Sequence, residues 1–118
     1  MTASELLRWQ WEGYSRYHQS RLNLQLHIVL VPLFLVSNVA FLVAILQRSW
    51  LVGIVAAAAM VLSIAIQGRG HRREPVPPEP FTGPANAISR ILLEQWVTFP
   101  RFVLSGGWLR ALRQRSAP

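Results

Sequence analysis

The chain has 118 residues, of which 52% are hydrophobic, and a formal net charge of +7. This composition fits a single domain and is too apolar for an ordinary soluble protein of this size, so we interpret the chain as an integral membrane protein. The absence of cysteine excludes disulfides, thiolate catalysis and cysteine-based zinc sites. Nucleic-acid binding is disfavoured as well, because the arginines flank apolar segments and no groove-reading motif accompanies them.

Residues 3–20 predict an amphipathic helix, because leucine, tryptophan and tyrosine alternate with charged residues at helical spacing. Tryptophan and tyrosine beside arginine suit the headgroup layer of a membrane. The segment carries Glu5 and Glu12 and has no apolar core of its own. It is therefore not expected to be a secretory signal peptide.

Two uncharged segments come next, at residues 22–47 and 49–68, and only Arg48 separates them. As helices at ~1.5 Å per residue they would be roughly 39 and 30 Å long, enough to cross a hydrocarbon layer of ~30 Å. So short a turn makes the helices antiparallel, which predicts a transmembrane hairpin. Because small residues let helices approach closely, we expect the Ala/Gly-rich second segment to pack against the first or against a second copy in a homo-oligomer. A buried helical bundle of a soluble protein is the alternative.

The C-terminal part begins with a proline-rich loop at residues 74–84, whose prolines exclude helix and strand. Residues 84–105 predict a second interfacial helix, kinked at Pro100, with Arg90, Glu94 and Arg101 on its polar side. A basic tail is expected at residues 106–118. The expected fold class is therefore an all-α membrane protein: a two-span hairpin between amphipathic interfacial helices.

The arginines predict the topology, because nine of them flank the hairpin and one lies in its turn. By the positive-inside rule both termini are then cytoplasmic. The lack of lysine and the many alanines indicate a GC-rich bacterial genome, and so a bacterial inner membrane. The flanking residues are Arg8, Arg16, Arg21, Arg69, Arg72, Arg73, Arg110, Arg113 and Arg115.

The three histidines of the chain, His18, His27 and His71, all fall near the same end of the predicted hairpin. Imidazole is a common ligand of iron, zinc and copper, so three of them, with or without a carboxylate, form a plausible metal site. His18 and His27 are nine residues apart and would point in opposite directions on one continuous helix. A shared metal therefore requires a helix break near residues 20–23. The alternative is three unrelated, solvated histidines at the interface.

Two polar neighbours accompany these histidines. Glu74 lies three residues after His71 and would either bind the metal or orient a ligating histidine. Asn23 shares a helix face with His27, although it is also suited to pairing with backbone groups where the span begins.

The pattern Tyr14-x-x-Tyr17-His18-x4-Asn23-x3-His27-x4-Pro32, with Gln67-x-x-Gly70-His71-x-x-Glu74 after the spans, resembles the Mpo-type family of fungal 2-hydroxy fatty acid dioxygenases. The resemblance covers the two ends that flank the apolar segments. It implies a small membrane protein that uses Fe(II) and O2 to shorten a 2-hydroxy fatty acid by one carbon in α-oxidation. It also implies that His18, His27 and His71 hold the iron.

These observations predict an Fe(II)-dependent dioxygenase at the cytoplasmic membrane face, with a membrane lipid or fatty acid and O2 as partners. Tyr17, Asn23 and Glu74 are the candidate catalytic and orienting residues. A non-enzymatic membrane scaffold or assembly protein is the alternative function. Four arginines are expected to attract the substrate carboxylate, with the acyl chain along the hairpin: Arg21, Arg69, Arg72 and Arg73.

Overall fold

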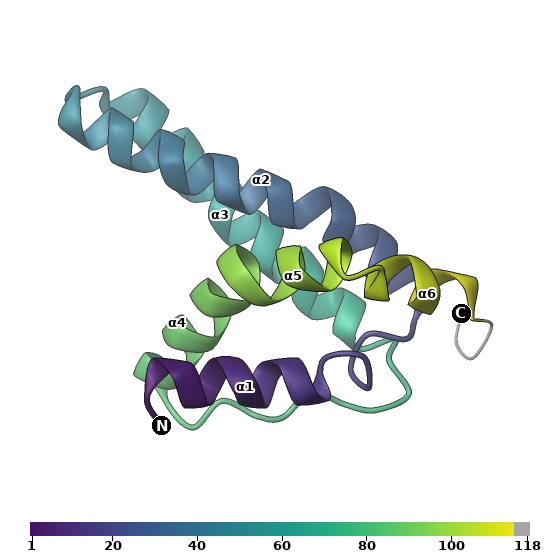
Figure 1. Ribbon diagram of the computed structural model, residues 1–118. Helices are drawn as coiled ribbons and strands as arrows, with labels where there is room; N and C mark the ends of the chain where they lie inside the picture. The colour runs from purple at the N-terminus through teal and green to yellow at the C-terminus, as the bar shows by residue number, and fades with distance from the viewer. Residues whose placement is uncertain (115–118) are drawn as a thin grey trace.

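A computed structural model describes residues 1–114, and within that range the chain is helical without strands (Figure 1). Helices α2 (Arg21–Leu46) and α3 (Trp50–His71) form an antiparallel hairpin whose turn projects away from the rest of the molecule. The remaining elements gather at the other end of the hairpin. They are α1 (Ala3–Gly13), α4 (Pro84–Leu93), the π-helical turn η1 (Glu94–Thr98), α5 (Phe99–Leu104) and α6 (Gly107–Arg113). The predicted all-α, two-span architecture is confirmed.

The two long helices present most of their apolar surface to the outside. Each contains an 18-residue apolar window of which only 22% is buried, and both are long and apolar enough to cross a membrane. A soluble protein would cover so large an apolar surface, whereas a lipid environment requires it. Exposed apolar side chains on these helices include Val29, Val36, Leu42, Leu51, Ile54 and Val61.

Small residues of α3 pack against α2 within the same chain. Gly53, Ala56 and Ser63 are buried, and a Cβ added at Gly53 would lie 3.7 Å from the Cβ of Ala44. The hydroxyl of Ser63 donates a hydrogen bond of 2.7 Å to the carbonyl of Leu30. Of the two packing arrangements expected for this Ala/Gly-rich helix, the structure therefore shows the one inside the hairpin.

The N-terminal amphipathic helix is shorter than predicted. It ends at Gly13 instead of residue 20, the chain turns through residues 14–17, and α2 begins after Ser20. Glycine is a poor helix former, and after it the backbone hydrogen bonds tighten to three-residue turns, from the N–H of Arg16 to the carbonyl of Gly13 and from that of Tyr17 to the carbonyl of Tyr14. The break that a shared metal requires between His18 and His27 is therefore present, a few residues earlier than expected.

The carboxylate of Glu74 holds this bend in place. It accepts hydrogen bonds from the backbone N–H of Gln19 at 2.7 Å, from that of Ser20 at 3.0 Å, and from the Asn23 amide at 2.7 Å. Glu74 is only 8% exposed. Hydrogen bonds to a buried carboxylate are stronger than neutral ones, so the start of the proline-rich loop is fastened to the start of α2.

The second interfacial helix contains a π turn that its sequence did not predict. Pro84 occupies the start of α4, as expected, but at η1 the backbone N–H of Phe99 reaches back five residues to the carbonyl of Glu94. Pro100 comes directly after Phe99 and has no N–H to offer the preceding turn, which accounts for the irregular hydrogen bonding there. The extra residue in the turn rotates α5 about its axis, so that Phe99 and Phe102 are buried.

Within the predicted basic tail, Gly107–Arg113 form a further helix, α6. The indole N–H of Trp108 donates to the carbonyl of Leu24 at 2.9 Å, which ties α6 to α2. Residues 115–118, including Arg115, lie outside the described part of the chain.

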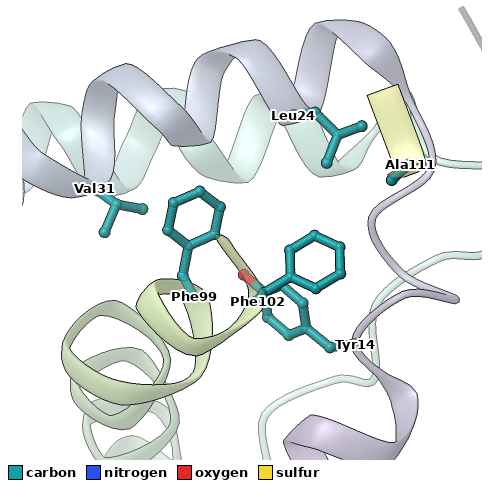
Figure 2. Packing of buried hydrophobic residues seen from close by; sticks show 6 residues of the cluster. All are labelled: Tyr14, Leu24, Val31, Phe99, Phe102 and Ala111. Carbon is teal, nitrogen blue, oxygen red and sulfur yellow. The ribbon is translucent and has the colours of Figure 1, made fainter. Parts of the chain in front are cut away.

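Figure 2 shows the buried cluster formed between α2, α5, α6 and the turn after α1. The rings of Tyr14 and Phe102 meet edge to face with centroids 4.9 Å apart. Because Tyr14 belongs both to this cluster and to the turn that carries His18, the packed core sets the position of the turn. The members of the cluster are Tyr14, Leu24, Val31, Phe99, Phe102 and Ala111.

Gly70 should be essential for the approach of α3 to α2. A Cβ at this position would lie 2.5 Å from Oδ1 of Asn23 and 3.1 Å from Cδ1 of Leu26, whereas one at Gly68 would meet nothing within 4 Å. We expect Gly70→Ala to destabilise the protein by ~1–3 kcal/mol through overpacking. Gly68→Ala is the matched control and should be neutral or stabilising, because alanine is the better helix former.

Thermal unfolding of the two variants in detergent, monitored by circular dichroism, tests this expectation. Equal melting temperatures for Gly70→Ala and Gly68→Ala would show that the contact between Gly70 and Asn23 does not constrain the hairpin.

Candidate metal centre

Four side chains from four separate segments converge at the base of the hairpin. His18 comes from the turn after α1, His27 from α2, His71 from the last turn of α3 and Glu94 from the start of η1. One donor atom from each lies within 4.8 Å of all the others. The imidazole centroids are 4.8, 5.0 and 5.1 Å apart, and the ring planes are nearly perpendicular. The convergence of the three histidines expected from the sequence is confirmed.

Backbone carbonyls determine which nitrogen of two rings faces the centre. Nδ1 of His18 bonds to the carbonyl of Tyr14 at 2.8 Å, and Nδ1 of His27 to that of Asn23 at 2.9 Å. A carbonyl only accepts, so each Nδ1 carries the proton. In the neutral rings Nε2 then holds the lone pair, which is the form that binds a metal.

The nitrogen atoms that face the centre are buried and have no hydrogen-bond partner within residues 1–114. This is true of Nε2 of His18, Nε2 of His27 and Nδ1 of His71. Leaving a buried polar atom unpaired costs ~1–3 kcal/mol, so three such atoms pointing at one another are unfavourable unless something binds them. Three nitrogen donors and one carboxylate oxygen suit a divalent transition metal, so the residues present fit a metal ion.

Glu94 is a ligand candidate that the sequence did not reveal. We expected it on the polar, solvent-facing side of the interfacial helix. Instead its Oε2 lies 3.4 Å from Nε2 of His18 and 3.9 Å from Nε2 of His27. The hydroxyl of Tyr14 donates a hydrogen bond to this Oε2, and such a bond favours the ionised form of a carboxylate. An ionised carboxylate is thus available as a ligand.

No local pattern in the sequence indicated Glu94. It is separated from His71 by the proline-rich loop, and no motif links the two positions. It reaches the cluster because η1 packs against α1 and α2, with the neighbouring Gln95 and Thr98 buried.

Glu74, by contrast, does not belong to the cluster. The expectation that it binds the metal or directly orients a histidine is corrected, because its oxygens are occupied by the bend before α2. It is connected to His27 through Asn23, whose side chain donates to Glu74 and whose carbonyl accepts from His27. Asn23 is therefore the orienting residue, through its backbone.

Tyr17 also lies apart from the four donors. Its hydroxyl is directed to Oε1 of Glu79 in the proline-rich loop, at 3.5 Å, on the exposed side of the molecule. The tyrosine that touches the metal centre is Tyr14, whose hydroxyl donates to Oε2 of Glu94 at 2.8 Å.

A cavity of about 560 Å³ opens beside the cluster, between α1, α3, α4 and the proline-rich loop. His18, His71 and Glu94 line it, whereas His27 is fully buried and does not. A ligand in the cavity therefore meets His18, His71 and Glu94 but not His27. The wall includes Trp9, Ile64, Gly68, Phe81 and Ile91.

Two buried amides close one wall of the cavity. Gln67 and Gln95 each donate to the other, at 3.0 and 2.8 Å, and Gln67 also donates to the hydroxyl of Ser63. This pair bonds α3 to η1. The pair thereby fixes the position of α3, which carries His71, relative to η1, which carries Glu94.

The arginines at the cavity are not those predicted. Arg21 donates to the carbonyl of Leu112, and Arg69, Arg72 and Arg73 are exposed and do not line the cavity. The cavity is lined instead by Arg16 and Arg90.

Arg90 fastens the proline-rich loop over the cavity. Its guanidinium donates to the carbonyls of Glu79 and Pro80 at 2.9 and 3.1 Å, and it lies 4.5 Å from the ring of Phe81 and 4.9 Å from that of Trp9. Hydrogen bonds and cation–π contacts together hold the loop against α1 and α4.

Comparison with protein-family models, with curated proteins and with solved structures found no match.

The centre predicts a metal affinity that depends on Glu94 and not on other carboxylates of the cavity. Glu94→Gln should weaken Fe(II) or Co(II) binding ~10- to 100-fold or more, the loss typical of even an outer-shell residue. Glu79→Gln is the matched control: Glu79 also lines the cavity but lies in the loop, so the metal affinity should not change.

Anaerobic titration of purified protein against a competing chelator gives both affinities. If Glu94→Gln and Glu79→Gln bind metal equally well, Glu94 is not a ligand.

Proposed function

We propose that this protein is an Fe(II)-dependent dioxygenase that shortens 2-hydroxy fatty acids by one carbon at the cytoplasmic face of a membrane. The observation that carries the proposal is the set of three unpaired, buried imidazole nitrogens and one carboxylate at the end of a partly apolar cavity. The resemblance of the histidine motifs to the Mpo-type family supports the choice of iron and of substrate.

In this proposal His18, His27, His71 and Glu94 hold the metal. Three nitrogens and one oxygen would allow a bound metal ion to take further ligands from the cavity, which His18, His71 and Glu94 line. Bound Fe(II) would supply the Lewis acid and the redox chemistry that activation of O2 requires. One O2 is a sufficient oxidant if the carboxyl carbon leaves as CO2 and water is the other product, so no further reductant is needed.

The cavity is suited to an amphipathic acid. Its inner end carries the three donors His18, His71 and Glu94, while apolar side chains line the part toward α3 and α4. Arg16 and Arg90 supply positive charge near the carboxylate of such a ligand. The proline-rich loop shields the centre on its outer side. The acyl chain therefore lies between α1, α3 and α4, and not along the outside of the hairpin.

The proposed orientation in the membrane rests on the arginines and the exposed apolar surface. The hairpin turn carries one arginine, and the end that carries the metal centre has most of the others. With both termini cytoplasmic, the centre lies at the cytoplasmic interface of what we propose is a bacterial inner membrane. A hydroxy acid in that leaflet can enter the cavity without leaving the bilayer.

Activity should require both the metal ligands and an open cavity. Protein loaded anaerobically with Fe(II) is expected to consume O2 together with a 2-hydroxy fatty acid. His71→Ala should abolish both iron retention and turnover, because it removes one of three imidazoles.

Gly68→Leu places a bulky side chain in the cavity without clashing at its Cβ. It should retain iron but lose at least ~10-fold in kcat/KM, which corresponds to ~1.4 kcal/mol.

Gly68→Ala is the control for the cavity, since one methyl group leaves most of the space open. O2 uptake and chain-shortened acid, measured over a range of chain lengths, provide the readout. Wild-type protein that binds no iron and consumes no hydroxy acid would favour the non-enzymatic scaffold. Iron without turnover would refute the substrate but not the metal centre.

Topology has its own test, helped by the absence of native cysteine. Single cysteines at Ser15 and Ser49 should react from opposite sides of the membrane, Ser15→Cys from the cytoplasm and Ser49→Cys from outside. A membrane-impermeant maleimide applied to spheroplasts and to inverted vesicles measures this. The reverse labelling would place the metal centre on the outer face.

A further inference from the structure

One residue contacts two candidate ligands at once. The ring of Tyr14 stacks on the imidazole of His18 with centroids 3.7 Å apart and planes inclined by 11°. Its carbonyl accepts the Nδ1 proton of His18 at 2.8 Å, and its hydroxyl donates to Oε2 of Glu94 at 2.8 Å. Tyr14 is 4% exposed and packs against Phe102 in the buried cluster. The packed core thus holds it in one position.

The three contacts differ in what they require of the side chain. The bond from His18 uses the backbone and is available to any residue, and the stacking contact needs only an aromatic ring. The bond to Glu94 needs the phenol. This hydroxyl connects the turn after α1 to η1 at the centre, and it acts on the same carboxylate oxygen that lies nearest His18 and His27.

The phenol contacts Glu94 as a donor, since its O–H lies 2.8 Å from Oε2 and both side chains are largely buried. A protonated phenol against an ionised carboxylate forms a charge-assisted bond, stronger than a neutral one. Such a bond restricts rotation of the carboxylate and keeps Oε2 directed at the imidazole nitrogens.

We propose that Tyr14 is a positioning residue: its hydroxyl orients the Glu94 carboxylate as the fourth metal ligand. This inference rests on the proposed function in one respect, that the centre holds a metal. The sequence motif favoured Tyr17 as the tyrosine of the site, but its hydroxyl points to Glu79 in the loop.

The chain offers a matched pair of variants to test the role. Tyr14→Phe retains the ring stack and the backbone carbonyl and removes only the hydroxyl, and Tyr17→Phe makes the same change outside the four donors. The affinity of each variant for Co(II) is measured anaerobically, and the visible spectrum of bound Co(II) reports its coordination. Tyr14→Phe should weaken binding ~10- to 100-fold and alter the spectrum, whereas Tyr17→Phe should do neither. Circular dichroism of the metal-free proteins verifies that the helices are intact.

A double-mutant cycle shows whether Tyr14 acts through Glu94. On a Glu94→Ala background the hydroxyl has lost its acceptor, so adding Tyr14→Phe should cause no further loss of Co(II) affinity. An equal loss with and without Glu94 would overturn the inference, as would a Tyr14→Phe protein that binds Co(II) like wild type. Either result leaves the metal centre in place. Wild-type protein that is folded but binds no Co(II) would refute both this inference and the proposed function.

Discussion

The bend between α1 and α2 is the constraint on which the metal centre depends. His18 and His27 would face opposite ways on a continuous helix, and they meet because the chain leaves the helix at Gly13 and re-enters it after Ser20. The bend is held from one side by the buried carboxylate of Glu74, which takes up the backbone N–H groups that the broken helix leaves unpaired. It is held from the other side by Tyr14, packed against Phe102.

The hydrogen bonds around the centre leave the inward-facing nitrogens without partners. His18 and His27 donate their Nδ1 protons to backbone carbonyls. The buried nitrogens that face the centre have no hydrogen-bond partner among residues 1–114. Such an arrangement would be a preorganised ligand set for a metal ion, because the packing of the surrounding helices already places the donors. A bound metal ion would satisfy atoms that the fold itself leaves unpaired.

The candidate metal centre and its cavity lie at one end of the apolar hairpin. α3 ends at His71, so one end of a long apolar helix carries a candidate ligand, and the cavity begins on its side at Ile64 and Gly68. Charged and polar groups gather at this end of the hairpin, while its projecting part is apolar up to the turn, which carries Arg48. A ligand with an acidic head and an apolar tail matches this polarity along the cavity, which is the physical basis for proposing a hydroxy acid.

Sequence alone determined the hairpin and the placement of His18, His27 and His71 near one end of it, because hydropathy and helix length are local properties that set topology without knowledge of contacts. Tertiary structure decided which carboxylate joins them. Glu74 had the better spacing, yet it binds the backbone N–H groups of the bend, while the π turn and the packing of η1 against α2 brought in Glu94. It also decided which tyrosine contacts the four donors, Tyr14 instead of Tyr17. It placed Arg90 at the cavity instead of the exposed arginines. Those choices depend on helix rotation and on competition for hydrogen-bond partners, which are set only when distant segments pack.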